Sequence, residues 1–335
     1  MPPFDSLSFD GLDVNECDEA GYSLLMLAVM SHQREVIDKL LEHGADPKIA
    51  TKKGETCLHM AVSSAVSRFH TIYASEAALA ATGETAQCER ETELCETAAS
   101  VKEEETYRKD TERGLHVVWA LLEHGADPNA TDDMGFSPLH AAIVSATGDL
   151  HRLSTVLALL VEHGADINAR EQNEQGMTVL HYTCAVSHAG ERDDSRDEEH
   201  VLSSLAILVD DMKADVKVRA GSAHRGMGAV HFAAKRGHPR VVERLVQCLT
   251  GTDGSEEGPA AALQWADEEG NTAMHYAVLH HRSDVVNTLL ELGAAPAPRN
   301  NAGQTPEEWE EAAGASSSPL YSISQSQQQQ RIFNR

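Results

Sequence analysis

The chain has 335 residues, of which 41% are hydrophobic but only 4% aromatic, and 53 acidic against 27 basic residues give a formal charge of -26. A core that must be built from Leu, Ala, Val and Met favours stacked helices over a β-sandwich or barrel. The negative charge would repel a phosphate backbone or an anionic membrane, so we expect neither nucleic acid nor a membrane as partner.

Cysteine usage and the start of the chain bear on its compartment. The six cysteines show no CxxC pairing, and the opening MPPFDSLSFDG lacks the basic and apolar regions of a secretory leader. The apolar run VLALLV at 156–161 stops at Glu162, far short of the roughly 18 residues that a membrane span needs. We therefore expect an intracellular protein, cytoplasmic or nuclear, without membrane insertion.

Two short sequence patterns alternate along the chain. The first begins with or near a helix-capping residue and continues with small apolar residues that let a neighbouring helix approach closely. The second ends an amphipathic helix at a Gly suited to a left-handed cap. The first pattern reads SLLMLA at 23, TCLHMA at 56, SPLHAA at 137, TVLHYT at 178, GAVHFA at 228 and TAMHYA at 272; the second reads LLEHGADPKIA at 40, LLEHGADPNA at 121, LLVEHGADINA at 159 and LLELGAAPAP at 289.

Segments rich in Asp, Asn and Gly, such as ADPNATDDMG, follow the second pattern and predict a hairpin turn before the next helix. One unit is therefore a hairpin and two helices. The fourth and fifth copies depart from this pattern, because Thr183 replaces Ala and no Gly closes AILVDDMKADVKV. Lys213 takes the position of that Gly.

The TPLHxA-like and GADxNA-like patterns resemble the ankyrin repeat, whose period is about 33 residues. The resemblance implies an all-α repeat solenoid of six repeats over residues 18–310, with a partial C-terminal cap in GQTPEEWEEAAG from 303. It also implies that the chain binds another protein. Residues 1–17 are predicted as an N-terminal lead, and the Ser- and Gln-rich residues 311–335 as a disordered tail.

Three predicted insertions, about residues 68–113, 188–199 and 250–262, interrupt the repeat period. The first lies between the two helices of the second repeat, and the second between the two helices of the fourth. This position should place both on the edge opposite the hairpins. The composition of 68–113 fits two alternatives, a projecting helical hairpin that turns near Gly83 and a disordered segment. The acidic GERDDSRDEEH at 190–200 is predicted as a solvated loop.

The 18 histidines raise the question of a metal or acid-base site, but five occupy one position of the first pattern and three precede Gly in the second. In ankyrin-like repeats the first set resembles a structural histidine that bonds neighbouring repeats. His181 and Cys184 form an HxxC pair without a second pair of matching spacing. No nucleophile elbow, zincin, dinucleotide or P-loop motif stands in a suitable context. We expect no enzymatic activity, no metal and no cofactor.

Two asparagines are candidates for modification. Asn129 and Asn168 resemble the hairpin asparagines that asparaginyl hydroxylases modify in some ankyrin repeats. The alternative is that both simply stabilise their turns.

Partner-binding residues are sought where the repeats vary, because the stacking positions must be kept. The position after each hairpin Gly holds a large apolar side chain in three consecutive repeats, and aromatic and Met side chains carry interface energy when exposed. The alternative is that this position packs between hairpins. The candidates are Tyr22, Met134, Phe136, Met177 and Met227 in the hairpins, Met30, Val144 and Leu279 on the first helices, and Lys235 and Arg236 as local positive charge.

The sequence thus predicts an adaptor or scaffold that binds a protein through the concave face of hairpins and first helices. One alternative is a structural subunit of a large assembly, for example a cytoskeletal one, docked through the insertions. The other is an inhibitory regulatory subunit of an enzyme.

Overall fold

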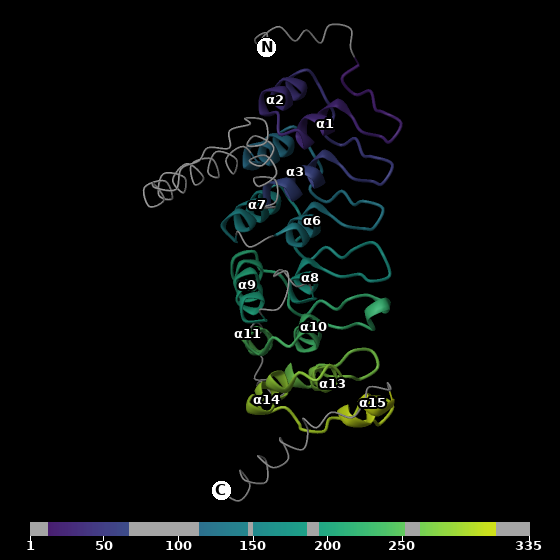
Figure 1. Cartoon of the computed structure of the whole chain (residues 1–335), viewed down its shortest axis with the longest axis vertical. Helices are drawn as coiled ribbons and strands as arrows, with labels where there is room; N and C mark the ends of the chain where they lie inside the picture. Colours follow the sequence, from purple (N-terminus) through teal and green to yellow (C-terminus); the bar gives the residue numbers. More distant parts are fainter. Residues whose placement is uncertain (1–12, 67–113, 147–149, 186–193, 252–261, 313–335) are drawn as a thin grey trace, which may run out of the picture. The chain divides into compact units, whose positions relative to one another are not determined.

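The structure, a computed structural model, describes residues 13–66, 114–146, 150–185, 194–251 and 262–312 (Figure 1). The chain divides into two compact units, Met1–Asp166 and Ile167–Arg335, so the predicted repeat region is shared between them. The predicted insertion 68–113, with its two alternatives, lies outside the described residues, as do most of the predicted insertion 250–262 and the tail from 313 on.

Unit 1 contains helix pairs that alternate with hairpins. Each first helix packs against the first helix of the next repeat, so α1, α3 and α6 lie side by side. In Figure 1 the hairpins project from these first helices, on the side away from the second helices. The first helices are α1 (Leu24–Met30), α3 (Cys57–Val66) and α6 (Pro138–Ser145); the second helices are α2 (Arg34–Glu42), residues 114–123 and α7 (Leu150–Glu162).

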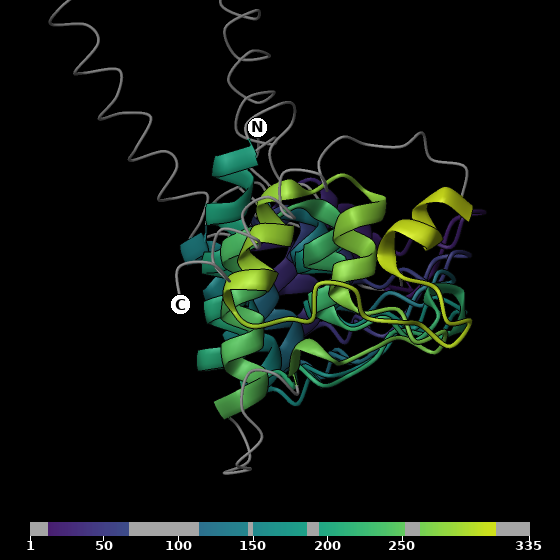
Figure 2. The same cartoon turned by 90° about the horizontal axis from the view of Figure 1, so that it is seen from below.

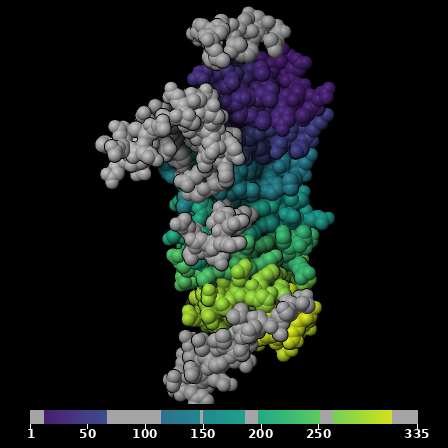
Figure 3. Space-filling model, viewed as in Figure 1, coloured from purple at the N-terminus to yellow at the C-terminus, as the bar shows by residue number. Residues whose placement is uncertain are grey.

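Unit 2 repeats the arrangement, with α8, α10 and α13 adjacent in turn. Seen from below, its helix pairs lie on one side and its hairpin loops on the other (Figure 2). The space-filling view shows its successive repeats as adjacent bands of colour (Figure 3). The first helices are α8 (Val179–Ala185), α10 (Ala229–Arg236) and α13 (Ala273–Leu279); the second helices are α9 (Asp194–Ala206), α11 (Pro239–Gly251) and α14 (Ser283–Glu291). Hairpin turn η3 (Ser222–His224) and a last helix, α15 (Pro306–Ala312), complete the unit. The described residues confirm the all-α repeat solenoid.

The hairpins stack through backbone hydrogen bonds at their tips. In unit 1 the amide of Lys52 donates to the carbonyl of Ala20 at 3.1 Å. In unit 2 the amide of Glu268 donates to Arg225 at 2.8 Å, and that of Asn301 to Glu269 at 2.9 Å. Each hairpin therefore satisfies backbone groups of its neighbour that would otherwise remain unpaired.

The acidic run predicted as a solvated loop is instead helical from Asp194 on, so that prediction is wrong for α9. Asp197 and Glu198 are only 3% and 9% exposed. Asp197 lies 3.5 Å from the Arg236 guanidinium, and Glu198 accepts the backbone N–H of Arg240 at 2.7 Å, in the first turn of α11. A helix N-terminus and a neighbouring cation favour buried carboxylates. These partners come from the next repeat, and composition does not show them.

The second helices end at a left-handed residue. Gly44, Gly125, Gly164 and Gly293 have φ between 83° and 96°. Lys213 has φ 60°, which confirms that it occupies the equivalent position.

One residue is inserted just before Lys213. In the other repeats an Ala amide bonds a Leu carbonyl five residues back, as Ala45 does to Leu40, but Ala214 reaches six residues back to Leu208. The π-helical segment η2 (Ile207–Asp211) contains the extra residue, as single-turn π-bulges do. Leu208 thereby remains fully buried in the position that Leu40 occupies.

The predicted partial cap is helix α15, which packs on α13. The Trp309 ring makes edge contacts with His275 and Tyr276, at centroid distances of 6.0 and 5.4 Å. The helix continues to Ala312, two residues past the predicted end of the repeat region. None of the helices in the described ranges has the length and apolarity needed to cross a membrane.

Candidate protein interaction surface

The histidines at the fourth position of the first pattern are structural. Nδ1 of His59 accepts the backbone N–H of Thr56 at 3.2 Å, and Nε2 lies 3.0 Å from the carbonyl of Phe136 in the next repeat. His181 and His275 make the same pair of bonds, to Val218 at 3.1 Å and Gln304 at 3.3 Å. These contacts confirm the predicted bond between neighbouring repeats for His59, His181 and His275.

These bonds also fix the charge state of the histidines. An Nδ1 that accepts an N–H carries no proton, so Nε2–H donates to the carbonyl and the ring is neutral. Burial lowers the pKa of both His181 and His231 to about 4, and it also lowers the pKa of His59 and His275. Neutral rings bonded in this way are poor candidates for general acid-base chemistry at pH 7.

Both residues of the HxxC pair, His181 and Cys184, take part in the packing of the repeats. His181 uses both ring nitrogens within the repeat stack, and burial raises the pKa of the Cys184 thiol to about 12. Within the described ranges no three His, Cys, Asp or Glu side chains gather as metal ligands would.

The hairpin asparagines connect one repeat to the next. Asn129 donates from Nδ2 to the Gly164 carbonyl and accepts the amide of Asp166 at Oδ1, both at 2.9 Å. Asn168 accepts the amide of Asp215 at 2.8 Å. Asn15, which the sequence analysis did not single out, makes the same contact with Asp46. This geometry agrees with the turn-stabilising alternative, and modification of Asn129 and Asn168 stays a prediction.

The side chains at the position after the hairpin Gly are more buried than a row of exposed partner-binding residues would be. Met177 and Met227 are each 4% exposed, and Asn271 is fully buried. Tyr22 and Phe136 are half-buried, and Phe136 contacts the His140 ring edge-on at 5.9 Å. The prediction that this position presents exposed apolar side chains is therefore wrong for Met177 and Met227.

Two other hairpins are held at this position by an aspartate. Asp267 accepts the amides of Glu269 and Asn271 at 2.9 and 2.8 Å, and Asp132 accepts those of Met134 and Phe136 at 2.9 Å. Before Met177 and Met227 the next hairpin approaches closely, because an added Cβ would come within 3.0 Å of Gly221 at Gly176 and within 2.9 Å of Glu268 at Gly226. Asx turns of this kind are local, but the burial depends on the neighbouring hairpin.

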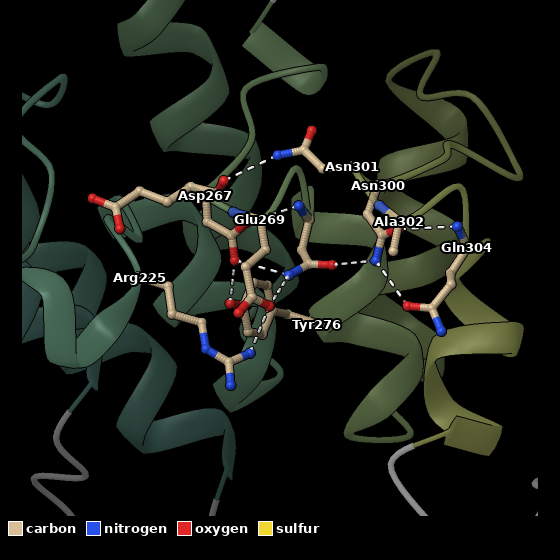
Figure 4. Close-up of polar contacts among 10 residues, drawn as sticks. Arg225, Asp267, Glu269, Tyr276, Asn300, Asn301, Ala302 and Gln304 are labelled. Carbon is tan, nitrogen blue, oxygen red and sulfur yellow. Dashed lines mark hydrogen bonds and ion pairs between the residues drawn. The ribbon is translucent and has the colours of Figure 1, made fainter.

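A polar network joins the last hairpins of unit 2 (Figure 4). The Asn300 side chain donates to Asn271 Oδ1 at 3.0 Å, and Asn271 Nδ2 donates to Asp267 Oδ2, also at 3.0 Å. The Tyr276 hydroxyl donates to the same carboxylate at 2.7 Å, and burial raises the pKa of this tyrosine. Buried polar groups that satisfy one another specify one packing arrangement. The network holds the hairpins and offers no free catalytic group.

Exposed large apolar side chains gather on unit 1. Met30 and Val144 occupy the same position of their first helices, with Ser63 at that position on α3 between them. Leu27 lies one turn earlier on α1. Sequence analysis missed Leu24 and Leu27, because the first pattern hides them among buried residues. Among the described residues the exposed set is Leu24 at 37%, Leu27 at 45%, Met30 at 52%, Trp119 at 45%, Met134 at 65% and Val144 at 46%.

Unit 2 presents a different surface at the equivalent positions. Where α1 has Leu27, unit 2 has Tyr182, Phe232 and Tyr276, which are only 4 to 9% exposed. The hydroxyl of Tyr182 donates to Glu171 and thereby turns the ring toward the hairpin. Where α1 has Met30, unit 2 has exposed Lys235 and half-buried Leu279, and Arg236 follows, also half-buried. The two units therefore differ in the chemistry of their first-helix face.

Comparisons with known proteins agree with this architecture. The family model described as "Ankyrin repeats (3 copies)" matches residues 4–72 and 199–300, and the one described as "Ankyrin repeat" matches 134–172. NF-kappa-B inhibitor zeta of Homo sapiens is 28% identical over 208 residues, 57% of this chain and 27% of that protein. NF-kappa-B inhibitor delta of Mus musculus is 27% identical over 210 residues, 57% of each chain. Diacylglycerol kinase iota of Rattus norvegicus is 29% identical over 123 residues, 35% of this chain and 11% of that protein.

Solved structures show the same fold. The ankyrin repeat domain of Bcl-3 superimposes with a TM-score of 0.54 at 20% identity, covering 92% of this chain and 100% of that one. The human ASB11 ankyrin repeat domain gives 0.51 at 15% identity, covering 86% and 91%. The chain spans about a quarter of the length of NF-kappa-B inhibitor zeta. Since the family model matches more than half of its residues, the chain belongs to the ankyrin-repeat family.

Proposed function

We propose that the chain is a protein-binding module whose contact surface in unit 1 is the apolar strip Leu27, Met30 and Val144. Ankyrin repeats generally mediate protein–protein interaction. The observation that carries the proposal is the exposure of these three apolar side chains, at 45, 52 and 46%, on first helices whose other large apolar side chains are mostly buried.

The strip has the properties of an interface centre. The helices that carry the strip, α1 and α6, already pack against neighbouring helices of unit 1. An incoming partner would therefore order few additional groups. Met30 adds a side chain that adapts to irregular surfaces. Burying three such side chains removes apolar area worth about 25 cal/mol per Å² from water, before the cost of association is subtracted.

The relatives favour a regulatory role over a passive one. Two of the similar proteins are named NF-kappa-B inhibitors, and their match covers more of this chain than that of diacylglycerol kinase iota. We therefore take an NF-kappa-B protein as the first partner to test, with inhibition as the expected effect. In the adaptor alternative, the chain binds the partner through the same surface but does not inhibit it. The structural alternative would place the contact on the insertions, most of which lie outside the described residues.

The test measures binding of a purified NF-kappa-B protein to the immobilised chain. The variant Leu27→Ser/Met30→Ser/Val144→Ser removes the strip. The matched control is Trp119→Ser, which removes an equally exposed apolar side chain from a second helix of the same unit. Circular dichroism first establishes that both variants are folded. We expect the strip variant to weaken binding at least tenfold, as loss of a hot-spot cluster does, and Trp119→Ser to have little effect.

Other outcomes separate the alternatives. Binding that survives in the strip variant but is lost on deletion of residues 70–112 would place the contact on the insertion. If no NF-kappa-B protein binds, a photo-crosslinking residue at position 30, compared with one at position 119, identifies the partner in source cells. Equal crosslinking at the two positions would contradict the strip as the binding surface.

A further inference from the structure

Unit 2 carries a cluster of basic side chains on its first-helix face, which we call the basic cluster: His224, Lys235, His280 and Arg282. They come from three different elements. His224 lies in η3, Lys235 in the last turn of α10, and His280 and Arg282 in the connection from α13 to α14. The fold thus brings together residues that are up to 58 positions apart in the sequence.

Several contacts place these groups next to one another. The Arg282 Nε donates to the carbonyl of Lys235 at 3.2 Å. The Arg282 side chain lies over Gly237, where an added Cβ would come within 2.7 Å of its Cδ. Burial lowers the pKa of His280, and the charges of Lys235 and Arg282 lower it further; Lys235 acts in the same direction on His224. The two permanent charges and the two imidazoles therefore share one small area.

The two permanent charges of the basic cluster differ from the basic side chains beside them. Among the residues that the structure describes, neither Lys235 nor Arg282 forms an ion pair, whereas the neighbouring Arg236 lies 3.5 Å from Asp197. This occurs in a chain whose 53 acidic residues outnumber its 27 basic ones. Lys235 also occupies the exposed position that Met30 and Val144 occupy in unit 1.

We infer that the basic cluster binds an acidic segment of a protein partner. This inference rests on the proposed function that the chain binds proteins, and it assigns a partner chemistry to unit 2. Guanidinium groups bind carboxylates with charge-assisted hydrogen bonds. Arg282 uses Nε on the Lys235 carbonyl, and within the described residues its terminal nitrogens make no hydrogen bond. Lys235 adds an exposed ammonium beside it.

A nucleic acid fits the same surface less well. The formal charge of -26 repels a long polyanion, whereas a short acidic segment meets mainly the local field. Single-stranded nucleic acids also use exposed aromatic rings for stacking. The neighbouring rings of Phe232 and Tyr276 are only 4 and 6% exposed.

The test uses a fluorescein-labelled peptide of alternating Glu and Leu, with a Gln-and-Leu peptide of the same length as control, in fluorescence anisotropy with the full chain. Lys235→Glu/Arg282→Glu reverses the two permanent charges of the basic cluster. Lys52→Glu/Lys53→Glu makes the same charge change on exposed lysines of unit 1. We expect the cluster variant to weaken binding of the Glu peptide about tenfold or more, with little effect of the control variant, and high salt to weaken native binding.

Three results would overturn the inference: equal binding of the Glu and Gln peptides, equal weakening by both charge-reversal variants, or tighter binding of an oligodeoxynucleotide of the same length than of the Glu peptide. Thermal unfolding of both variants shows whether they keep the native fold. Lys235→Gln/Arg282→Gln, which removes the two charges without reversing them, tests the loss of peptide binding with a smaller perturbation. Failure here, with the unit 1 strip variant still losing its partner, would leave the proposed function intact.

Discussion

At the scale of single residues, the left-handed position that ends a second helix is occupied by either Gly or Lys. Four second helices end at Gly with φ between 83° and 96°, and a fifth ends at Lys213 with φ 60°. A side chain in the left-handed region costs about 1 kcal/mol, because Cβ approaches the following carbonyl oxygen. Lys213 offsets part of this cost by donating from Nζ to the carbonyl of Asp210.

We predict that Lys213→Gly stabilises the protein by about 0.5 kcal/mol. Relief of the left-handed strain should exceed the loss of the hydrogen bond and the added flexibility of Gly in the unfolded chain. Urea unfolding followed by circular dichroism measures the change in the free energy of unfolding. Gly164→Lys serves as the reverse control and should be destabilising. A less stable Lys213→Gly variant would show that the Nζ bond outweighs the strain.

At the scale of elements, the first helices begin at Ser or Thr except in α10, which begins after Gly228. Ser23 caps α1 by accepting the amide of Met26 at 3.3 Å. In the other repeats that begin at Ser or Thr, the hydroxyl lies 2.8 to 3.1 Å from Nδ1 of the histidine three residues on. At Gly228 an added Cβ would come within 2.6 Å of Cη2 of Trp265. The indole, which also lies 5.1 Å from the Arg219 guanidinium, thus takes the space of the capping side chain.

The cap substitution Gly228→Thr should therefore destabilise the protein, although Thr is the usual residue at this position. We expect a loss of about 1–3 kcal/mol from the steric conflict with Trp265. In the background Trp265→Ala the same substitution should cost much less or become stabilising, since a Thr cap contributes about 1 kcal/mol. A double-mutant cycle in urea measures this coupling. Additive effects of the two changes would contradict the steric account.

At the scale of the whole molecule, the neutral histidines make stability depend on pH. Burial lowers the pKa of His181 and His231 from 6.5 to about 4, and it lowers the pKa of His59 and His275 in the same direction. Above pH 6.5 these rings are neutral in both states, and their contribution to stability is fully present. As the pH falls toward 4, the unfolded chain binds more protons than the folded one, and the contribution is lost.

We expect the free energy of unfolding to fall as the pH is lowered from 7 to 5. The net charge approaches zero near the sequence pI of about 5.0, so weaker self-repulsion would act in the opposite direction. Glu310, whose pKa is raised by burial, also opposes the trend. His181→Gln should be less stable at pH 7 but less sensitive to pH. Stability that rises between pH 7 and 5 in the native chain would show that charge repulsion dominates.

The repeat positions could be predicted from sequence because each has a local physical reason. A capping hydroxyl, a helix-ending Gly and an amphipathic second helix recur in fixed order, and even Lys213 was identified by its place in that order. The burial of Met177 and Met227 could not be predicted, because it depends on the neighbouring hairpin. Alternation and composition give no measure of how far two hairpins approach each other.

The sequence by itself determined the all-α repeat fold, the structural role of the repeated histidines and the positions of the helix ends. Each of these depends on groups a few residues apart, or on a contact that every repeat makes in the same way. Only the tertiary structure decided that acidic residues of α9 are buried against the next repeat and that Lys235 lies beside Arg282. These outcomes depend on charges brought together from different repeats, and the distance between them is set by the packing of the helices.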